Sequence, residues 1–389
     1  MLRRAEIDRL VASLVADEIG RARKRAVDFA VWGAWTPETT VDEDGVGADS
    51  LTRLEVVARV NEFFHLHESG VEDYLLVRRT LGDWSEIVAE GLKLAGERIT
   101  FRSSGSTGAP KTATHSMADL TAEIDAVWER IGPRGRILSW TPPHHIYGFL
   151  FTALLAARRD RPVVEMRAKA PSLRAVADGD LLVATPFQWA LCLKAGGVDA
   201  EDVVGLSAAA PASEDIWSGA ASAGIRLVEI YGSSETAGVG LREAGDAPFE
   251  LLPRWSRGPG DAQLRDAGGA LIDAPDALDW EVDRRFRPAG RRDGVVQVGG
   301  VNVDPAMVRA VLQDIDWVEE AAVRLDENGA DGGRLKAFLA TRGAPPEEEA
   351  LQRVVQHCAE RLEGPARPAS FRLGSDLPRN AMGKLADWT

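Results

Sequence analysis

The stretch Ser103-Ser104-Gly105-Ser106-Thr107-Gly108-Ala109-Pro110-Lys111 decides how this 389-residue sequence is interpreted. It places four hydroxyl side chains, two glycines and a lysine in nine residues, after a short expected strand at 97–101. Glycines let backbone N–H groups approach an anion, hydroxyls add donors and lysine adds positive charge, so the stretch favours a phosphate-binding loop. It is not a Walker loop, because the four residues after Gly105 lead to Pro110-Lys111 rather than to Gly-Lys. A polar surface turn is the plainer alternative.

Outward from this loop the apolar pattern changes in kind. Before it, spacings of three and four predict amphipathic helices over 3–23 and 51–64. After it, short aliphatic runs alternate with helical stretches, and this alternation of expected strands and helices is typical of a mostly parallel α/β sheet. The runs lie at 136–140, 161–166, 181–186 and 225–232, and the helical stretches at 117–130 and 211–223.

The rest of the chain completes a three-part organisation. Residues 253–276 are rich in Gly, Pro and Asp and predict a loop or a small irregular sheet. The last hundred residues predict a small α+β domain with two helices, over 305–312 and 346–362. We therefore expect a helical domain at 1–95, an α/β core at 96–290 and an α+β domain at 291–389.

Composition excludes several classes of function. The net charge of −14 would repel nucleic acid. Cys192 and Cys358 are far apart, so neither a disulfide framework nor a cysteine zinc site is expected. The N-terminus has no uninterrupted signal core, and the longest apolar run, at 147–157, ends at two arginines. We expect a cytoplasmic monomer or homodimer with no membrane partner.

Six motifs together resemble those of the adenylate-forming superfamily of acyl-CoA synthetases and other AMP-binding ligases. SSGSTGAPK resembles its signature loop, and the other motifs follow in family order. They are TPPHHIYGF (141–149) at the acyl pocket, SAAAP (207–211) at the adenine, YGSSE (231–235) at the Mg·ATP, GRRDGVVQVGG (290–300) at the hinge and thiol tunnel, and LPRNAMGK (377–384), the C-terminal lysine loop. The implied fold is α/β: a truncated adenylate-forming ligase core with a helical N-terminal domain and a small mobile α+β C-terminal domain.

The resemblance implies a two-step reaction. A carboxylate attacks the α-phosphate of ATP, pyrophosphate leaves, and the thiol of CoA then takes the acyl group from the adenylate. The implied catalytic residues are Lys384, which offsets the repulsion between the two anions, Glu235, which holds Mg²⁺, and His145. His145, Tyr147 and Gly148 would line the acyl pocket.

Further residues are assigned by position in the motifs. The implied ATP-binding residues are Ser103, Ser104, Gly105, Ser106, Thr107, Gly108, Lys111, Ala209, Tyr231, Gly232, Ser233, Ser234, Asp276 and Arg291. Asp293 would be the hinge, and Gly299 and Gly300 would leave room for the pantetheine arm. Asp276 is chosen by the family's usual spacing before Gly290, with Asp279 as the alternative, because Ala274-Pro275 departs from the usual Thr-Gly.

The segment before the loop is short, and it carries two further resemblances. With about ninety-five residues before the loop, the chain resembles the short 4-coumarate:CoA ligases of the photoactive yellow protein type, and HHIYG supports a hydroxycinnamate or hydroxybenzoate substrate. Residues 45–64 resemble the start of helix two of an acyl carrier protein, whose serine carries phosphopantetheine. Ser50 could then be the thiol-bearing residue, or Asp49-Ser50 could simply cap a helix.

Three hypotheses follow. The leading one is an aryl acid:CoA ligase that uses ATP, Mg²⁺ and CoA and converts 4-coumarate or a related aryl acid. The second is an aryl acid ligase that loads an acyl carrier protein, its own Ser50 included. The third, from another class, is an inactive nucleotide-binding carrier or docking protein, and retention of both Lys384 and Glu235 argues against it.

Overall fold

A computed structural model describes residues 2–23, 25–103, 111–169, 172–299, 301–326, 333–379 and 385–388. The chain divides into two compact units: residues 1–102 with 112–290, and residues 103–111 with 291–389. The structure does not describe residues 104–110, Gly300 or 380–384. These ranges include six residues of the expected ATP and thiol sites, and the expected catalytic lysine. These are Ser104, Gly105, Ser106, Thr107, Gly108, Gly300 and Lys384.

The first unit begins with a helical layer. Its long helices are α1 (Arg4–Ala22), α3 (Ser50–Phe64) and α5 (Leu81–Ala95). The short ones are α2 (Phe29–Trp32), η1 (Leu66–Glu68) and α4 (Tyr74–Val77). Helix α1 packs on α3 and α5, and its buried Leu10 and Leu14 belong to the same hydrophobic cluster as side chains of the large sheet. Apolar residues at three and four spacing make this stripe.

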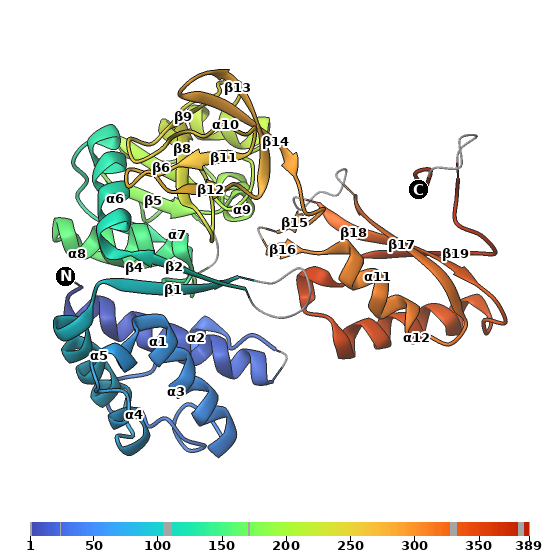
Figure 1. Ribbon diagram of the computed structural model, residues 1–389, viewed down its shortest axis with the longest axis horizontal. Helices are drawn as coiled ribbons and strands as arrows, with labels where there is room; N and C mark the ends of the chain where they lie inside the picture. Colours follow the sequence, from blue (N-terminus) through green and yellow to red (C-terminus); the bar gives the residue numbers. More distant parts are fainter. Residues whose placement is uncertain are drawn as a thin grey trace. The chain divides into compact units, whose positions relative to one another are not determined.

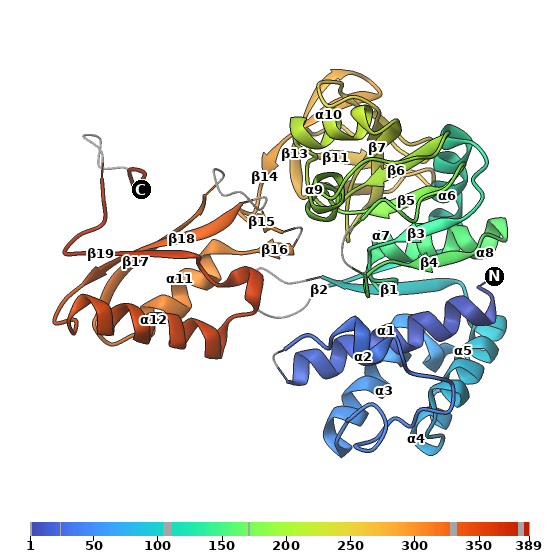
Figure 2. The ribbon, with the colours of Figure 1, turned by 180° about the vertical axis from the view of Figure 1, so that it is seen from behind.

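A pair of strands carries the expected phosphate loop. Strand β1 (Arg98–Ser103) pairs with β2 (Lys111–Ser116). Both ribbon views show this pair lying between the helical layer and the large sheet (Figures 1 and 2). The buried side chains Ile99 and Phe101 join the same hydrophobic cluster. Packing on both sides therefore fixes the strands that lead into and out of the loop.

The described residues form a large sheet of nine strands in the order β13-β14-β9-β8-β7-β6-β5-β3-β4. Strands β4, β3, β5, β6 and β7 run parallel, and β7, β8, β9 and β14 pair antiparallel. The bounds are β3 (Ile137–Ser139), β4 (Val163–Glu165), β5 (Leu181–Ala184), β6 (Val203–Ser207), β7 (Ile225–Ser233), β8 (Ala237–Arg242), β9 (Phe249–Leu251), β13 (Asp276–Val282) and β14 (Arg285–Arg291). The aliphatic runs thus form the parallel half, as expected from their continuous apolar character.

Helices cover both faces of the parallel strands. Alternate residues such as Leu181 and Leu182 belong to two different clusters, since successive side chains point to opposite faces. One face packs on α6 (Met117–Ile131) and on the run α7 (Ile146–Gly148), η2 (Phe149–Leu154) and α8 (Leu155–Arg159). The other packs on α9 (Pro186–Lys194) and α10 (Glu214–Ser222). The helix expected from 211 begins later, at Glu214, because Ser213 with its extended backbone takes the N-cap position.

The Gly/Pro-rich segment forms a small sheet of its own. It contains β10 (Ser256–Arg257), β11 (Gln263–Arg265) and β12 (Leu271–Asp273), paired antiparallel in that order. This is the irregular-sheet alternative expected for 253–276.

The second unit is an α+β structure, as expected for its residues. Strands β15 (Val296–Val298) and β16 (Val301–Val303) pair antiparallel, and β17 (Val318–Asp326), β18 (Arg334–Thr341) and β19 (Ser370–Gly374) form a sheet. Helices α11 (Pro305–Gln313) and α12 (Glu347–Arg361) and the short η3 (Gly364–Ala366) complete it. Buried Val308, Leu339 and Val354 share one core. Within the described part of the chain, no helix is both long and apolar enough to cross a bilayer.

Candidate active site

The expected site segments follow the carboxyl ends of neighbouring parallel strands. The HHIYG segment follows β3, the SAAAP segment follows β6, and the YGSSE segment ends β7. Strands β3, β5, β6 and β7 are adjacent in that order. In open α/β sheets ligands bind outside the carboxyl ends of the strands. The topology therefore brings three of the expected segments to one edge of the sheet.

The HHIYG segment is held tightly in place. His145 precedes α7, and its carbonyl accepts a hydrogen bond of 2.7 Å from the backbone N–H of Phe149. A side chain at Gly148 would place its Cβ 2.0 Å from the carbonyl oxygen of Pro142, so only glycine fits there. The Tyr147 hydroxyl donates to the carbonyl of Ala184 at the end of β5 (3.3 Å), and burial raises the pKa of Tyr147 well above its usual value. The Tyr147 phenol is therefore neutral.

The two histidines connect this segment to helix α1. The buried His144 bonds through Nδ1 to the Ser13 hydroxyl (2.7 Å), and its Nε2 lies 3.5 Å from an Asp17 carboxylate oxygen. Burial alone would raise the pKa of Asp17, but attraction from His144, His145 and Arg59 outweighs it and lowers that pKa strongly. The ring centroids of His144 and His145 are 4.3 Å apart. Surrounding protein and His144 lower the pKa of His145, which is neutral although its side chain still reaches solvent.

A second charged group lies where β1 enters the phosphate loop. Arg102, directly before Ser103, donates to Glu62 of α3 (2.5 Å) and to Glu18 of α1 (3.2 Å). Arg59, almost fully buried, donates to the same Glu62 (3.2 Å). These residues do not stand out in the sequence, because acids and arginines are ordinarily solvated on the surface. Their pairing shows that the helical layer holds the stem of the loop.

The YGSSE segment forms a tight turn at the end of β7. Ser233 Oγ accepts from the N–H groups of Glu235 and Thr236 (both 3.2 Å), and the Glu235 side chain is exposed. A Cβ at Gly232 would lie 2.2 Å from the carbonyl oxygen of Ala237, so the bulge here requires glycine. His115 on β2 donates from Nε2 to the carbonyl of Ser234 (2.7 Å), and burial lowers the pKa of His115. A neutral histidine thus connects the loop's exit strand to this turn.

A buried carboxyl group supports the same turn from below. Glu123 of α6 is fully buried and accepts the N–H of Gly238 with both oxygens at 3.0 Å. Arg254 lies 4.0 Å from Glu123 and donates to the carbonyl of Thr236 (2.9 Å). Burial raises the pKa of Glu123 to about 7, against the attraction of Arg254. Neither residue stands out in the sequence.

Tyr231 and Asp276 come together although 45 residues separate them. The Tyr231 hydroxyl donates to an Asp276 carboxylate oxygen at 2.6 Å. The Tyr231 ring packs edge-on against Phe286 and tilted against Phe249, with centroids 5.4 and 5.7 Å apart. The alternative acid, Asp279, is exposed on the same strand β13. The structure therefore brings the expected adenosine-contacting tyrosine to Asp276.

The expected adenine loop carries a strained backbone. Ala209 is exposed with φ at +77°, a conformation that non-glycine residues rarely adopt. The loop is anchored by the Ala212 N–H, which donates to buried Glu229 (2.9 Å), and Glu229 is itself paired with Arg242 at 2.8 Å. A fixed, small and exposed residue suits stacking of a flat base on the backbone.

The other expected residues that the structure describes belong to other elements. Lys111 is exposed at the start of β2. Arg291 and Asp293 form a bidentate pair (2.8 and 2.6 Å) in the second unit, and hydrogen bonding from Arg291 lowers the pKa of Asp293. Gly299 is exposed, with φ at +59°. Ser50 is exposed and is the first residue of α3. The N-cap of α3 is Asp49, whose carboxylate accepts a hydrogen bond from the Thr52 N–H at 2.7 Å.

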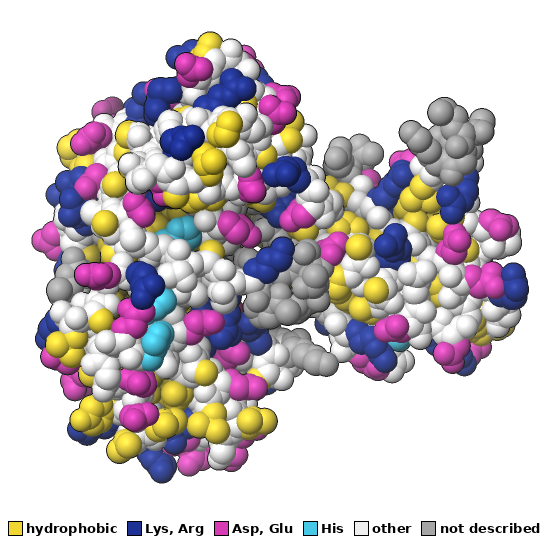
Figure 3. All heavy atoms as spheres, viewed as in Figure 1, with side chains coloured by type: hydrophobic (Ala, Val, Ile, Leu, Met, Phe, Trp, Pro, Cys, Tyr) yellow, Lys and Arg dark blue, Asp and Glu magenta, His cyan; other side chains and the backbone are white. Residues whose placement is uncertain are grey.

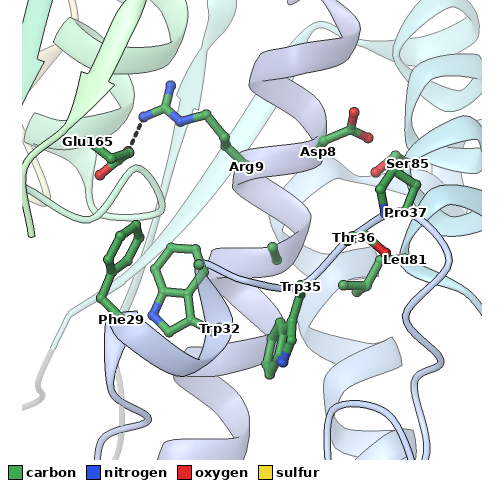
Figure 4. Close-up of a pocket in the computed structure, with 12 residues that line it drawn as sticks. Asp8, Arg9, Phe29, Trp32, Trp35, Thr36, Pro37, Leu81, Ser85 and Glu165 are labelled. Atoms are coloured by element: carbon green, nitrogen blue, oxygen red, sulfur yellow. Dashed lines mark hydrogen bonds and ion pairs between the residues drawn. The ribbon is translucent and has the colours of Figure 1, made fainter. Parts of the chain in front are cut away.

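An aromatic cavity of about 190 Å³ lies among the N-terminal helices (Figure 4). Phe29, Trp32 and Trp35 line it, and Arg9 reaches across it to Glu165 at the end of β4. It contains no expected site residue. We place the candidate site at the carboxyl ends of β3 to β7 instead, because hydrogen bonds join the expected residues there.

Comparison with known proteins identifies the family. Residues 101–261 match the family of AMP-binding enzymes. The chain is 38% identical over 410 residues to a 4-coumarate–CoA ligase of Cereibacter sphaeroides, an alignment that covers 100% of this chain and 97% of that protein. The chain belongs to the AMP-binding, adenylate-forming enzyme family.

Further relatives of this AMP-binding enzyme support the same family assignment. It is 36% identical over 394 residues to a 4-coumarate–CoA ligase of Halorhodospira halophila, covering 98% of each chain. Its fold superimposes on o-succinylbenzoate CoA synthetase from Bacillus subtilis with a TM-score of 0.62 at 16% identity, over 97% of this chain and 90% of that one. These findings confirm the expected α/β fold and the expected class, an AMP-forming acid–thiol ligase.

Proposed function

We propose that this AMP-binding enzyme activates an aryl carboxylic acid, 4-coumarate or a related hydroxycinnamate or hydroxybenzoate, with ATP and transfers the acyl group to CoA. The observation that carries the proposal is the shared edge: the expected acyl-pocket segment after β3 and Tyr231 near the end of β7, which donates to Asp276, lie toward the carboxyl ends of the parallel strands of one sheet. An acid and a nucleotide bound at this edge would meet. The full-length similarity to two 4-coumarate–CoA ligases supports the substrate class.

The residues present fit a nucleotide. The Asp276 carboxylate, oriented by Tyr231, suits acceptance of hydrogen bonds from the two vicinal hydroxyls of a ribose. Ala209 offers a fixed backbone surface for the base. Glu235 offers the hard oxygen ligand that Mg²⁺ prefers, and bound Mg²⁺ would neutralise charge on the leaving pyrophosphate. Lys111 and Lys384 would supply positive charge to the phosphates and to the attacking carboxylate.

The acyl segment fits a phenolic acid. His145 and Tyr147 are both neutral, so this part of the pocket offers hydrogen bonds without a net charge. A neutral phenol hydroxyl is accepted by such a site, whereas a carboxylate would be unpaired there. The acid would therefore bind with its ring toward the histidine segment and its carboxylate toward the nucleotide.

Two displacements complete the proposed reaction. A carboxylate oxygen attacks the α-phosphorus, the bond to pyrophosphate breaks, and an acyl-adenylate forms. The CoA thiolate then attacks the acyl carbon and AMP leaves with the bonding electrons. Asp293, paired with Arg291 just after the boundary of the two units, is the proposed hinge between the steps.

The second hypothesis is loading of an acyl carrier protein, and its version with the chain's own Ser50 as the acceptor site has less support. Asp49 already makes the helix cap, so Ser50 is not needed for α3, and its exposure leaves it open to modification. The side chains of α3 nevertheless pack into the core of the first unit, and Phe63 and Phe64 are buried there. Helix α3 therefore belongs to the core of the first unit rather than to a carrier domain of its own, and CoA is the proposed acceptor.

A hydroxamate-trapping screen tests the proposal. Benzoic, cinnamic, hydroxycinnamic and fatty acids are incubated with enzyme, ATP, Mg²⁺ and hydroxylamine, which reports adenylation without presuming the thiol. We expect the hydroxycinnamates to give the highest rates and to yield CoA thioesters when CoA replaces hydroxylamine. Preference for fatty acids would overturn the substrate class. Adenylation without thioester formation, together with a mass increase at Ser50 after phosphopantetheinyl transfer, would favour the carrier hypothesis.

A further inference from the structure

A cluster of metal-ligand side chains lies outside the candidate active site. Among the described residues, His65, His67 and Glu68 bring three ligand atoms within 4.8 Å of one another. His65 Nδ1 is 3.2 Å and His67 Nε2 is 3.9 Å from the same Glu68 oxygen. Two ligand atoms at about 2.1 Å from a tetrahedral metal are about 3.4 Å apart. The spacing therefore matches a metal site after a small movement of His67, whose side chain is exposed.

Both histidines are oriented through their other ring nitrogen. His65 Nε2 bonds to the Thr100 hydroxyl (2.7 Å), and His67 Nδ1 lies 3.3 Å from Asn61 Oδ1. The same Asn61 oxygen accepts the backbone N–H of His67 (2.9 Å), which fixes it as an acceptor. His67 must therefore donate from Nδ1, and its Nε2 lies on the carboxylate side. Metal-binding histidines are held by just such outer hydrogen bonds.

The Glu68 carboxylate supplies the negative charge of the cluster. His67 Nε2 and a carboxylate oxygen of Glu68 face each other at 3.9 Å, which is too far for a hydrogen bond but close enough for the two atoms to share a metal ion after a small movement. Arg98 and His65 Nδ1 also bind this oxygen of Glu68, so metal binding requires the half-exposed side chain of Arg98 to move away from it. His65 is fixed at the end of α3 with φ at +54°, so its ring is already in place.

We propose that His65, His67 and Glu68 bind a divalent transition-metal ion of the zinc class. Two imidazole nitrogens and one carboxylate oxygen are the donors that Zn²⁺ accepts, with a water in the fourth position. The site is separate from the magnesium expected at Glu235, which needs oxygen ligands only. His67 and Glu68 are exposed, so an ion has access to the cluster. Figure 3 shows how histidine, acidic and basic side chains are distributed over one face of the molecule.

The site is connected to the strands of the phosphate loop. The Thr100 hydroxyl that orients His65 also bonds to the Thr114 hydroxyl at 2.7 Å. Thr100 lies on β1 and Thr114 on β2, the strands that lead into and out of the expected loop. Bound metal would therefore hold the end of α3 against both strands.

Titration of ZnCl₂ into the chelator-stripped full-length protein by isothermal calorimetry tests the proposal. We expect one saturable site that raises the melting temperature, since a ligand that binds only the folded state stabilises it. His67→Ala and Glu68→Gln should weaken binding by more than about 100-fold, and Thr100→Val, which removes only the outer hydrogen bond, by about 10-fold. His357→Ala and the exposed Glu90→Gln are matched controls that should bind as the wild type does.

Melting temperatures in chelator separate lost metal binding from lost folding. His67 is exposed, so its alanine variant should melt with the metal-free wild type and gain nothing from zinc. The absence of a saturable site in the wild type would overturn the proposal, and so would unchanged zinc affinity in His67→Ala and Glu68→Gln. The outcome is independent of the ligase reaction, because no step of the assay needs ATP or an acid.

Discussion

Replacing Glu123 by Gln should change how the stability of the first unit depends on pH. The carboxyl group is fully buried, and burial raises its pKa from 4.5 to about 7. Because the folded pKa lies above the unfolded one, the folded chain binds more protons between these two pH values, and stability falls as pH rises through that window. A difference of about 2.5 pKa units corresponds to about 3 kcal/mol. This cost is absent below about pH 4.5 and complete above about pH 7.

The Gln variant removes the charge and keeps the oxygen that accepts the Gly238 N–H. Relative to the wild type, it should gain up to about 3 kcal/mol between pH 4.5 and pH 8. Urea unfolding at a series of pH values, followed by circular dichroism, measures this difference. Glu129→Gln, at an exposed position of the same helix, is the matched control and should track the wild type. A difference between wild type and Glu123→Gln that stays constant over this pH range would refute the reasoning.

Two further substitutions test the geometry of the edge. Tyr231→Phe removes the hydroxyl that orients Asp276 but keeps the packed ring, so little stability should be lost. The KM for ATP should rise about tenfold or more, because a hydrogen bond to a charged group contributes about 1.5–3 kcal/mol. An unchanged KM in steady-state kinetics would count against the assignment. Gly148→Ala should cost about 1–3 kcal/mol in urea unfolding and reduce adenylation, because its Cβ would overlap the Pro142 carbonyl. Gly197→Ala, where a Cβ meets no atom within 4 Å, should change neither, and equal effects at both positions would contradict the packing argument.

The sequence predicted the elements whose signal is local. Aliphatic runs marked the parallel strands, because a strand covered on both faces is apolar throughout. The resemblance to family motifs marked the segments after β3, β6 and β7, and in two of them a glycine is required by the local backbone, at Gly148 and Gly232. The helical spacing of Leu10 and Leu14 marked α1.

The supporting contacts could not be predicted in the same way. Glu123 and Gly238 are 115 residues apart, and Ser13 and His144 are 131 apart. Such pairs depend on how layers pack, which periodicity does not encode. The domain boundary expected at residue 95 stays a prediction. The N-terminal helices share one hydrophobic cluster with the large sheet. The spacing of apolar residues in 1–95 predicts the helices but not the elements against which they pack.

Release of pyrophosphate that depends on the acid tests the central claim most directly. Wild type, Lys384→Ala and Asp276→Asn are compared with ATP, Mg²⁺ and 4-coumarate in the absence of CoA. The account predicts rapid release by the wild type, a rate lower by at least about 100-fold for Lys384→Ala, and a raised KM for ATP with Asp276→Asn. Equal rates for wild type and Lys384→Ala, or release by the wild type that does not require the acid, would contradict it.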